Sequence, residues 1–81
     1  MTNTRDRIQE ILRDVLDLPD LVVSDRTVAS EVPGWDSLAH VSLMFSIEAE
    51  FAIAFSDVEL AGFADVGELV AVVDRKVDHG G

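Results

Sequence analysis

Three segments of this 81-residue chain place apolar residues three and four positions apart, and this spacing most constrains the fold. An α-helix has 3.6 residues per turn, so such a spacing gathers apolar side chains on one helix face. The segments are Thr4 to Leu18, Ser37 to Phe51 and Asp65 to Val77, and a shorter one runs from Ser56 to Ala61. They predict an all-α fold, a small four-helix bundle with three longer helices and a short third helix.

Capping and turn-forming residues set the expected ends of these helices. Pro19 ends the first helix, because proline breaks an α-helix from within. Asp36 is a suitable N-cap for the second helix, and Ser56 with Glu59 three residues later has capping-box spacing at the third. The fourth segment begins with the same spacing. The connection over residues 21–34 is long, and its apolar residues are expected to pack over the core.

The second predicted helix carries apolar residues on two opposite sides. The core stripe is expected to consist of Leu43, Met44, Ile47 and Phe51. The other set, here called the docking stripe, consists of Leu38, Val41 and Phe45, and Glu48 lies near it. A helix with one buried face does not need a second apolar stripe, so this helix is either buried on both sides or exposes a docking patch. We expect the exposed patch, because full burial of one helix is hard to arrange in a domain of three long helices.

The length and composition favour one folded domain spanning residues 1–81. Hydrophobic residues make up 48% of the chain, which argues against disorder. No apolar run approaches the length of a membrane span, and the polar start of the chain does not resemble a signal peptide. We expect a cytoplasmic, monomeric protein.

Charge and residue types exclude several kinds of partner and site. The net charge is −10, and from Thr27 to Asp74 there are nine acids but no lysine or arginine. Such a surface repels nucleic acid and anionic membranes and attracts basic partners, although the acidity could serve solubility alone. The chain has no cysteine, which excludes a disulfide framework and a thiol nucleophile. No metal site is expected, because His40 and His79 are far apart in sequence and no acids have EF-hand spacing.

Ser37 lies where the second predicted helix begins, and Gly34 before it allows the chain to turn. The backbone N–H groups and the dipole at this end of a helix favour negative charge. The Ser37 hydroxyl is therefore well placed to carry a phosphate ester.

A catalytic triad of Asp36, Ser37 and His40 is the competing interpretation of this segment. We expect His40 to project toward the core stripe as a half-buried residue, and no second acid or oxyanion loop is apparent. The segment Gly34-Trp35-Asp36-Ser37-Leu38 also lacks the second glycine of a G-x-S-x-G motif. The chain is therefore not expected to be an enzyme.

The same segment and the end of the second helix resemble the acyl carrier proteins. Those proteins have a G-x-D-S-L pattern followed by an amphipathic helix that closes in a Glu-rich stretch and Phe. Here the two parts are Gly34-Trp35-Asp36-Ser37-Leu38 and Ile47-Glu48-Ala49-Glu50-Phe51. The helix order, length, acidity and the segment Val66-Gly67-Glu68 extend the resemblance across the chain.

The resemblance implies that Ser37 is the attachment site of 4′-phosphopantetheine, which a separate phosphopantetheinyl transferase takes from coenzyme A. It also implies that Asp36 helps to present the serine and a metal to the transferase. The arm would supply the thiol that this chain lacks and would carry an acyl group as a thioester. Leu38, Val41 and Phe45 match positions of apolar contact with partner enzymes, and Glu48 matches an acidic contact. The partners implied are acyl-loading, acyl-transfer or condensing enzymes.

Details of the sequence refine the type of carrier. Carriers of fatty-acid synthesis usually have acids where this chain has Ala39 and Ser42, and the segment from Trp35 to Val41 looks more like discrete carriers of polyketide and related secondary-metabolite pathways. A fatty-acid-synthesis or peptidyl-type carrier and an unmodified helical protein-interaction module are the alternatives. Gly80-Gly81 would suit a ubiquitin-like protein, but the strand patterns of a β-grasp sheet are absent.

Overall fold

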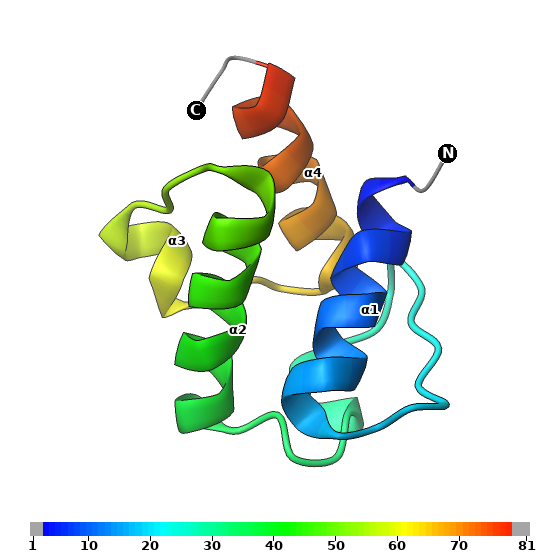
Figure 1. The fold of residues 1–81 in the computed structure, drawn as a ribbon. Coiled ribbons are helices and arrows are strands. Elements are labelled where there is room, and N and C mark those ends of the chain that lie inside the picture. Colours follow the sequence, from blue (N-terminus) through cyan, green and yellow to red (C-terminus); the bar gives the residue numbers. More distant parts are fainter. Residues whose placement is uncertain (1–2, 79–81) are drawn as a thin grey trace.

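The computed structural model describes residues 3–78, which fold into four α-helices and one 3₁₀ turn without any strand (Figure 1). The elements are α1 (Thr4–Leu16), η1 (Ala29–Glu31), α2 (Ser37–Phe51), α3 (Asp57–Ala61) and α4 (Val66–Asp78). α1 packs against both α2 and α4, while α3 is a single short helix on the other side of α2 and α4. The all-α prediction, with three longer helices and a short third one, is confirmed. Gly80-Gly81 and His79 lie outside the described residues.

α1 ends two residues earlier than the position of Pro19 suggested. It stops at Leu16, because Asp17 adopts the left-handed conformation with φ 55°. The N–H of Leu18 then donates to the carbonyl of Arg13 at 3.0 Å. This is a common way to satisfy the last carbonyls of a helix, so the helix has already ended when the chain reaches the proline.

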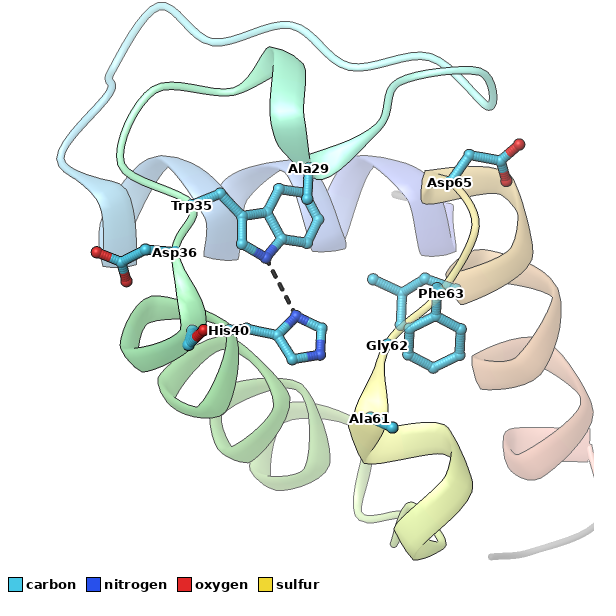
Figure 2. A pocket seen from close by; sticks show the side chains of 10 residues that line it. Ala29, Trp35, Asp36, His40, Ala61, Gly62, Phe63 and Asp65 are labelled. Carbon is cyan, nitrogen blue, oxygen red and sulfur yellow. Dashed lines mark hydrogen bonds between the residues drawn. The ribbon is translucent and has the colours of Figure 1, made fainter.

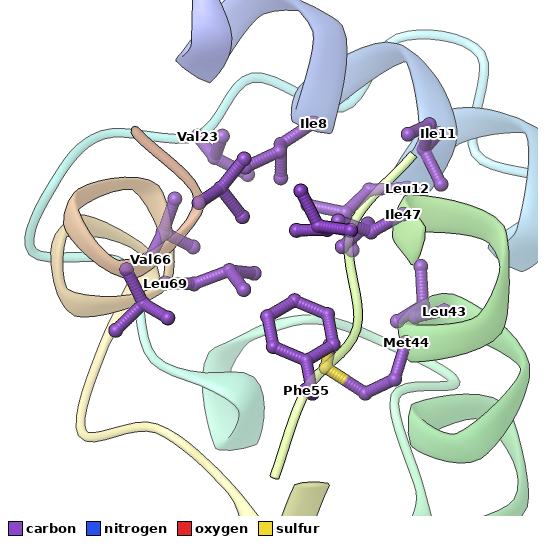
Figure 3. Close-up of a cluster of buried hydrophobic side chains, with 13 residues drawn as sticks. Ile8, Ile11, Leu12, Val23, Leu43, Met44, Ile47, Phe55, Val66 and Leu69 are labelled. Carbon is purple, nitrogen blue, oxygen red and sulfur yellow. The ribbon is translucent and has the colours of Figure 1, made fainter. Parts of the chain in front are cut away.

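The core lies between α1, α2 and α4 and includes three residues of the connections, Val23, Ile53 and Phe55. Leu43, Met44 and Ile47 of the core stripe are fully buried, and Phe51 is half-buried. In Figure 3 the three buried residues meet side chains from the other two helices and from the connections. These partners are Ile8, Ile11, Leu12, Val23, Ile53, Phe55, Val66, Leu69, Val72 and Val73. The predicted core stripe of α2 is thus confirmed.

The buried face of α4 is rotated from the one that the spacing predicted. We expected Val66, Leu69, Val70, Val73 and Val77 to face inward. Val77 is instead 46% exposed, whereas Val72 is buried. In the last turn the inward position is taken by Lys76, whose Nζ reaches Glu59 Oε1 of α3 at 2.9 Å. The apolar stem of a lysine can cover the core while its ammonium group pairs at the surface, so the prediction for Val77 was wrong.

The long connection between α1 and α2 is fixed to the start of α4. The N–H of Val66 donates to Thr27 O at 2.8 Å, and the N–H of Gly67 donates to Asp25 O at 2.8 Å. These bonds satisfy two N–H groups that have no partner within the helix. A Cβ atom at position 67 would lie 2.8 Å from Asp25 O, so this contact requires glycine. Since Val23 is also buried, the connection is held in place before it reaches Ser37.

No helix within residues 3–78 combines the length and the apolar character needed to cross a membrane.

Candidate functional site

Ser37 is the first residue of α2, and its side chain is exposed to solvent. The chain reaches it through Gly34, which has φ 83°, a conformation that glycine adopts easily. Asp36 caps the helix, because its Oδ1 accepts the N–H of Ala39 at 2.9 Å. Its carbonyl accepts the N–H of His40 at 2.8 Å. The predicted N-cap is confirmed, and the serine hydroxyl stands at the positive end of the helix dipole.

A bridge of three residues lies beside Ser37. Trp35 Nε1–H donates to His40 Nδ1 at 3.1 Å, and His40 Nε2 lies 3.1 Å from the carbonyl oxygen of Leu60 in α3. The indole nitrogen can only donate, so Nδ1 accepts and Nε2 carries the hydrogen that Leu60 O accepts. The two ring planes are 19° apart and the ring centroids 6.2 Å apart, so the rings meet edge to edge through the N–H···N bond. We call Trp35, His40 and Leu60 the imidazole bridge, and Figure 2 shows its bond between Trp35 and His40.

The hydrogen bonds of His40 argue against a catalytic triad of Asp36, Ser37 and His40. Both ring nitrogens of His40 are used within the chain, so the imidazole is not free to take a proton from Ser37. Figure 2 shows the carboxylate of Asp36 directed away from the imidazole. Among residues 3–78 the Ser37 hydroxyl has no hydrogen-bond partner. His40 is half-buried as expected, but it reaches toward α3 and not toward the centre of the core stripe.

A pocket of about 330 Å³ opens next to Ser37. One wall is formed by Trp35, Asp36, Ser37 and His40, and the facing wall by Ala61, Gly62 and Phe63 after α3. Ala29, Asp65 and Leu69 complete the lining, and Figure 2 shows the indole and the ring of Phe63 on opposite sides of the space. Sequence reasoning missed this pocket, because its walls come from segments whose proximity depends on the packing of α3.

The docking stripe is exposed. Leu38 is 82%, Phe45 60% and Val41 50% exposed, whereas the core stripe on the opposite side of α2 is buried. This confirms that α2 is buried on one side only. Val58 of α3 is also an exposed apolar residue, which the spacing in such a short helix did not reveal. Isolated exposed apolar residues are common, but a stripe along one helix is typical of an interaction surface.

Glu48 has a partner within the chain. Its Oε2 accepts the N–H of Phe55 at 2.7 Å, and its carbonyl accepts the N–H of Ile53 at 3.1 Å. Both bonds close the turn after α2, where Ala52 is left-handed with φ 55°. The carboxylate therefore holds the connection between α2 and α3, and a role for Glu48 in docking stays a prediction.

Two ion pairs link the helices that surround the site. The Ser56 backbone N–H and then Lys76 of α4 lower the pKa of Glu59, so its carboxylate holds α3 against α4. Glu50 near the end of α2 raises the pKa of Arg7 in α1, with which it pairs. Within residues 3–78 no three His, Cys, Asp or Glu side chains are grouped to hold a metal ion.

Comparisons with known proteins agree with this geometry. The family described as "Phosphopantetheine attachment site" matches residues 6–73. The acyl carrier protein of Thermotoga maritima is 25% identical over 71 residues, which are 88% of each chain. The solution NMR structure of the holo acyl carrier protein of Geobacter metallireducens superposes with a TM-score of 0.87 at 35% identity, over 95% of this chain and 88% of the other. This chain therefore belongs to the phosphopantetheine-attachment family as an acyl carrier protein, with a phosphopantetheine prosthetic group and a role in carrying acyl groups rather than in catalysis.

Proposed function

We propose that Ser37 is the residue to which the phosphopantetheine is attached. The observation that carries the proposal is the position of its hydroxyl, which is exposed, free of protein hydrogen bonds within residues 3–78 and located at the first residue of α2. A phosphodiester at this point gains from the helix dipole and from backbone N–H groups that the helix leaves unpaired. Ser42 and Ser46 lie within α2 and have neither advantage.

The chemistry of attachment has to be supplied from outside the chain. The Ser37 Oγ forms a bond to the phosphorus next to the pantetheine of coenzyme A, and the pyrophosphate bond breaks to release adenosine 3′,5′-bisphosphate. The hydroxyl proton must pass to a base. Since Asp36 caps the helix and both nitrogens of His40 are bonded, the base belongs to the phosphopantetheinyl transferase. Asp36, next to the serine and exposed, is the residue that would present a metal there.

The residues around Ser37 fit a prosthetic group that is anionic at one end and neutral beyond it. The phosphate would stand at the start of α2, and the adjoining pocket combines an indole, a phenyl ring and an imidazole with small residues and the side chains of Asp36 and Asp65. When bound, the group supplies the thiol that this cysteine-free chain lacks, and an acyl cargo is carried on it as a thioester. The chain contributes the anchoring oxygen and the surface that partner enzymes recognise.

We further propose that the docking stripe is the surface that partners contact. The exposure of Leu38, Val41 and Phe45 beside the serine supports this, because a partner that reaches Ser37 also covers the first turns of α2. The expected partners are the transferase and the enzymes that load, transfer or condense acyl groups. Glu48 would contribute an acidic contact only through the oxygen that does not bind the Phe55 N–H.

The polyketide or related secondary-metabolite context is also a proposal. It rests on Ala39 and Ser42, which place no acid on the first turns of α2 where carriers of fatty-acid synthesis usually have one. Partner recognition at this end of the helix would then depend more on apolar contact than on charge. A cytoplasmic, monomeric protein with one carrier domain stays our expectation; the single core shared by α1, α2 and α4 supports one domain.

Incubation with coenzyme A and a broad-specificity phosphopantetheinyl transferase tests the attachment site. Intact-mass measurement should show the gain of one phosphopantetheine on the wild-type chain and none on Ser37→Ala. Ser42→Ala is a matched control, because Ser42 is an exposed serine of the same helix, and it should gain the full mass. An undiminished mass gain on Ser37→Ala would show that the phosphopantetheine is attached to another residue. No gain on the wild type would favour the unmodified interaction module.

A further inference from the structure

The segment that precedes Ser37 and the end of α3 are connected by the ring of His40. On one side Nδ1 accepts the indole N–H of Trp35, and on the other side Nε2–H donates to Leu60 O. Trp35 lies two residues before Ser37 in the connection, and His40 lies three residues after it in the first turn of α2. Ser37 therefore lies between Trp35 and His40 in the sequence, although its own side chain takes no part in the hydrogen bonds of the bridge.

α3 depends on such links for its position. It has five residues, which is too short for a helix to be stable by itself. The Leu60 side chain packs against the core, and within residues 3–78 the polar ties of α3 to other helices are the Glu59–Lys76 ion pair to α4 and the bond from His40 to Leu60 O. The carbonyl of Leu60 is one of the terminal groups that no bond within the helix satisfies. His40 thus provides the hydrogen bond from α2 that this end of α3 needs.

The bridge also fixes the shape of the surface around the serine. Trp35 and His40 form one wall of the adjoining pocket, and residues 61–63, which directly follow Leu60, form the facing wall. A half-buried imidazole thus forms the direct hydrogen-bonded link between the two walls. If the bonds break, the indole and the end of α3 can move independently, and the surface that a partner meets at Ser37 is no longer preformed.

We propose that His40 is a positioning residue for the modification of Ser37: through Trp35 and Leu60 it holds the segment before the serine and the end of α3 in the arrangement that the transferase binds. This inference rests on the proposed attachment at Ser37. His40 acts on the binding of the carrier and not on the chemical step, because it touches neither the Ser37 hydroxyl nor a group that activates it. Its loss should therefore raise KM for the carrier and leave kcat nearly unchanged.

The test uses the initial rate of phosphopantetheine transfer at varied carrier concentrations, followed by intact mass. His40→Phe keeps a ring but removes both hydrogen bonds, and Trp35→Phe keeps a ring but removes the indole donor. Each variant should raise KM about threefold to tenfold, the equivalent of losing one or two hydrogen bonds during the ordering of the site. His40→Gln offers an acceptor and a donor on one side chain and should restore part of the loss.

A matched control separates positioning from a general loosening of α3. Lys76→Met removes the ion pair to Glu59 but keeps an apolar stem of similar length, and it leaves the imidazole bridge intact. Its KM should stay near that of the wild type. Circular dichroism checks that each variant keeps its helices. The indole N–H resonance in a ¹H–¹⁵N spectrum reports the bridge directly, because the chain has one tryptophan; this resonance should shift and exchange faster in His40→Phe but not in Lys76→Met.

The outcomes distinguish this inference from the proposed function. If the wild type gains no mass, or Ser37→Ala gains it, the attachment proposal itself fails. If Ser37 is modified but KM is unchanged in a folded His40→Phe whose indole resonance has shifted, the positioning role is refuted. An equal rise of KM in Lys76→Met would also refute it, because any loosening of α3 would then have the same effect. Loss of folding in His40→Phe leaves the decision to Trp35→Phe, which removes the indole N–H and part of the ring but keeps the bond from His40 to Leu60 O.

Discussion

The backbone N–H of Gly67 in α4 donates a 2.8 Å hydrogen bond to the carbonyl oxygen of Asp25, which lies in the connection that leads to Ser37. The first turn of α4 is thus in direct backbone contact with a segment that lies far earlier in the chain, before α2. This contact and the burial of Val23 anchor the connection, so that its last residues approach α2 from a fixed direction.

Gly67→Ala should destabilise the fold. The added Cβ would lie 2.8 Å from Asp25 O, which is backbone and can yield only if the whole connection moves. Overpacking of this kind costs about 1–3 kcal/mol, while alanine regains up to about 1 kcal/mol of helix propensity over glycine. We expect a net loss in the free energy of unfolding, measured with urea. Ala71→Gly, at an exposed position of the same helix, gives the propensity difference alone; a Gly67→Ala variant that is stabilised by that amount would show that the contact is not tight.

Phe45→Asp should weaken binding by partners while the helix content stays unchanged. Phe45 is 60% exposed on α2, so the new carboxylate remains in water. We expect a higher KM in phosphopantetheine transfer and an unchanged circular dichroism spectrum. Val22→Asp changes an exposed apolar residue outside the docking stripe and should leave the transfer rate unaltered. Ile47→Ala, on the buried side of the same helix, should instead cost about 2–5 kcal/mol of stability. If Phe45→Asp unfolds the domain, the assignment of the two faces is wrong.

Glu48→Ala should lower stability even when no partner is present. The substitution removes the carboxylate that accepts the N–H of Phe55 and leaves a half-buried turn without this bond. Hydrogen bonds to charged groups contribute roughly 1.5–3 kcal/mol, so chemical denaturation should detect the loss. Glu50→Ala removes a carboxylate in the same turn that forms a more exposed pair with Arg7 and should cost about 1 kcal/mol or less. Equal stabilities of the two variants would show that Glu48 is free for docking.

Acidification should remove the contribution of Glu59. Its pKa is lowered in the folded chain by the Ser56 backbone N–H and by Lys76. A carboxyl group with a lower pKa when folded adds stability above its unfolded pKa, near 4.3, and loses it as the pH falls through the folded value. Wild type and Glu59→Gln should therefore differ in unfolding free energy at pH 7 and converge as the pH falls below the lowered pKa of Glu59 in the folded chain. A constant difference over this range would show that the charge of Glu59 contributes nothing.

Local features of the chain made much of the fold predictable. α2 begins and ends at the expected residues, because Asp36 supplies its N-cap and the apolar spacing continues to Phe51. α3 was predicted from the capping box of Ser56 and Glu59. The two bonds of this box, and the bond from the Gly62 N–H to Glu59 O at the other end of α3, each join residues only three apart. Patterns of this kind are decided within one or two turns of a helix, where the sequence determines the outcome without knowledge of the packing.

Features that depend on distant segments were missed or misjudged. The bond from His40 to Leu60 O joins residues twenty apart, and no spacing rule connects them. Val77 follows the helical period, yet the packing of α3 against α4 brings Lys76 inward in its place. The role of Glu48 in partner contact stays a prediction, but its bond to the Phe55 N–H was missed, because this bond follows only from the path of the turn after α2. The packing of the helices determines where these side chains point, and the apolar spacing within one segment carries no information about that packing.

The placement of Trp35 gives the chain an optical reporter at its own site. It is the one tryptophan among 81 residues, and there is no tyrosine, so the long-wavelength fluorescence of the protein originates two residues from Ser37. The indole N–H is bonded to the His40 imidazole, and the indole lines the pocket beside Ser37. A group that enters this pocket should therefore change the emission of the unlabelled protein, so that occupancy beside the serine can be followed without any dye that would alter the surface under study.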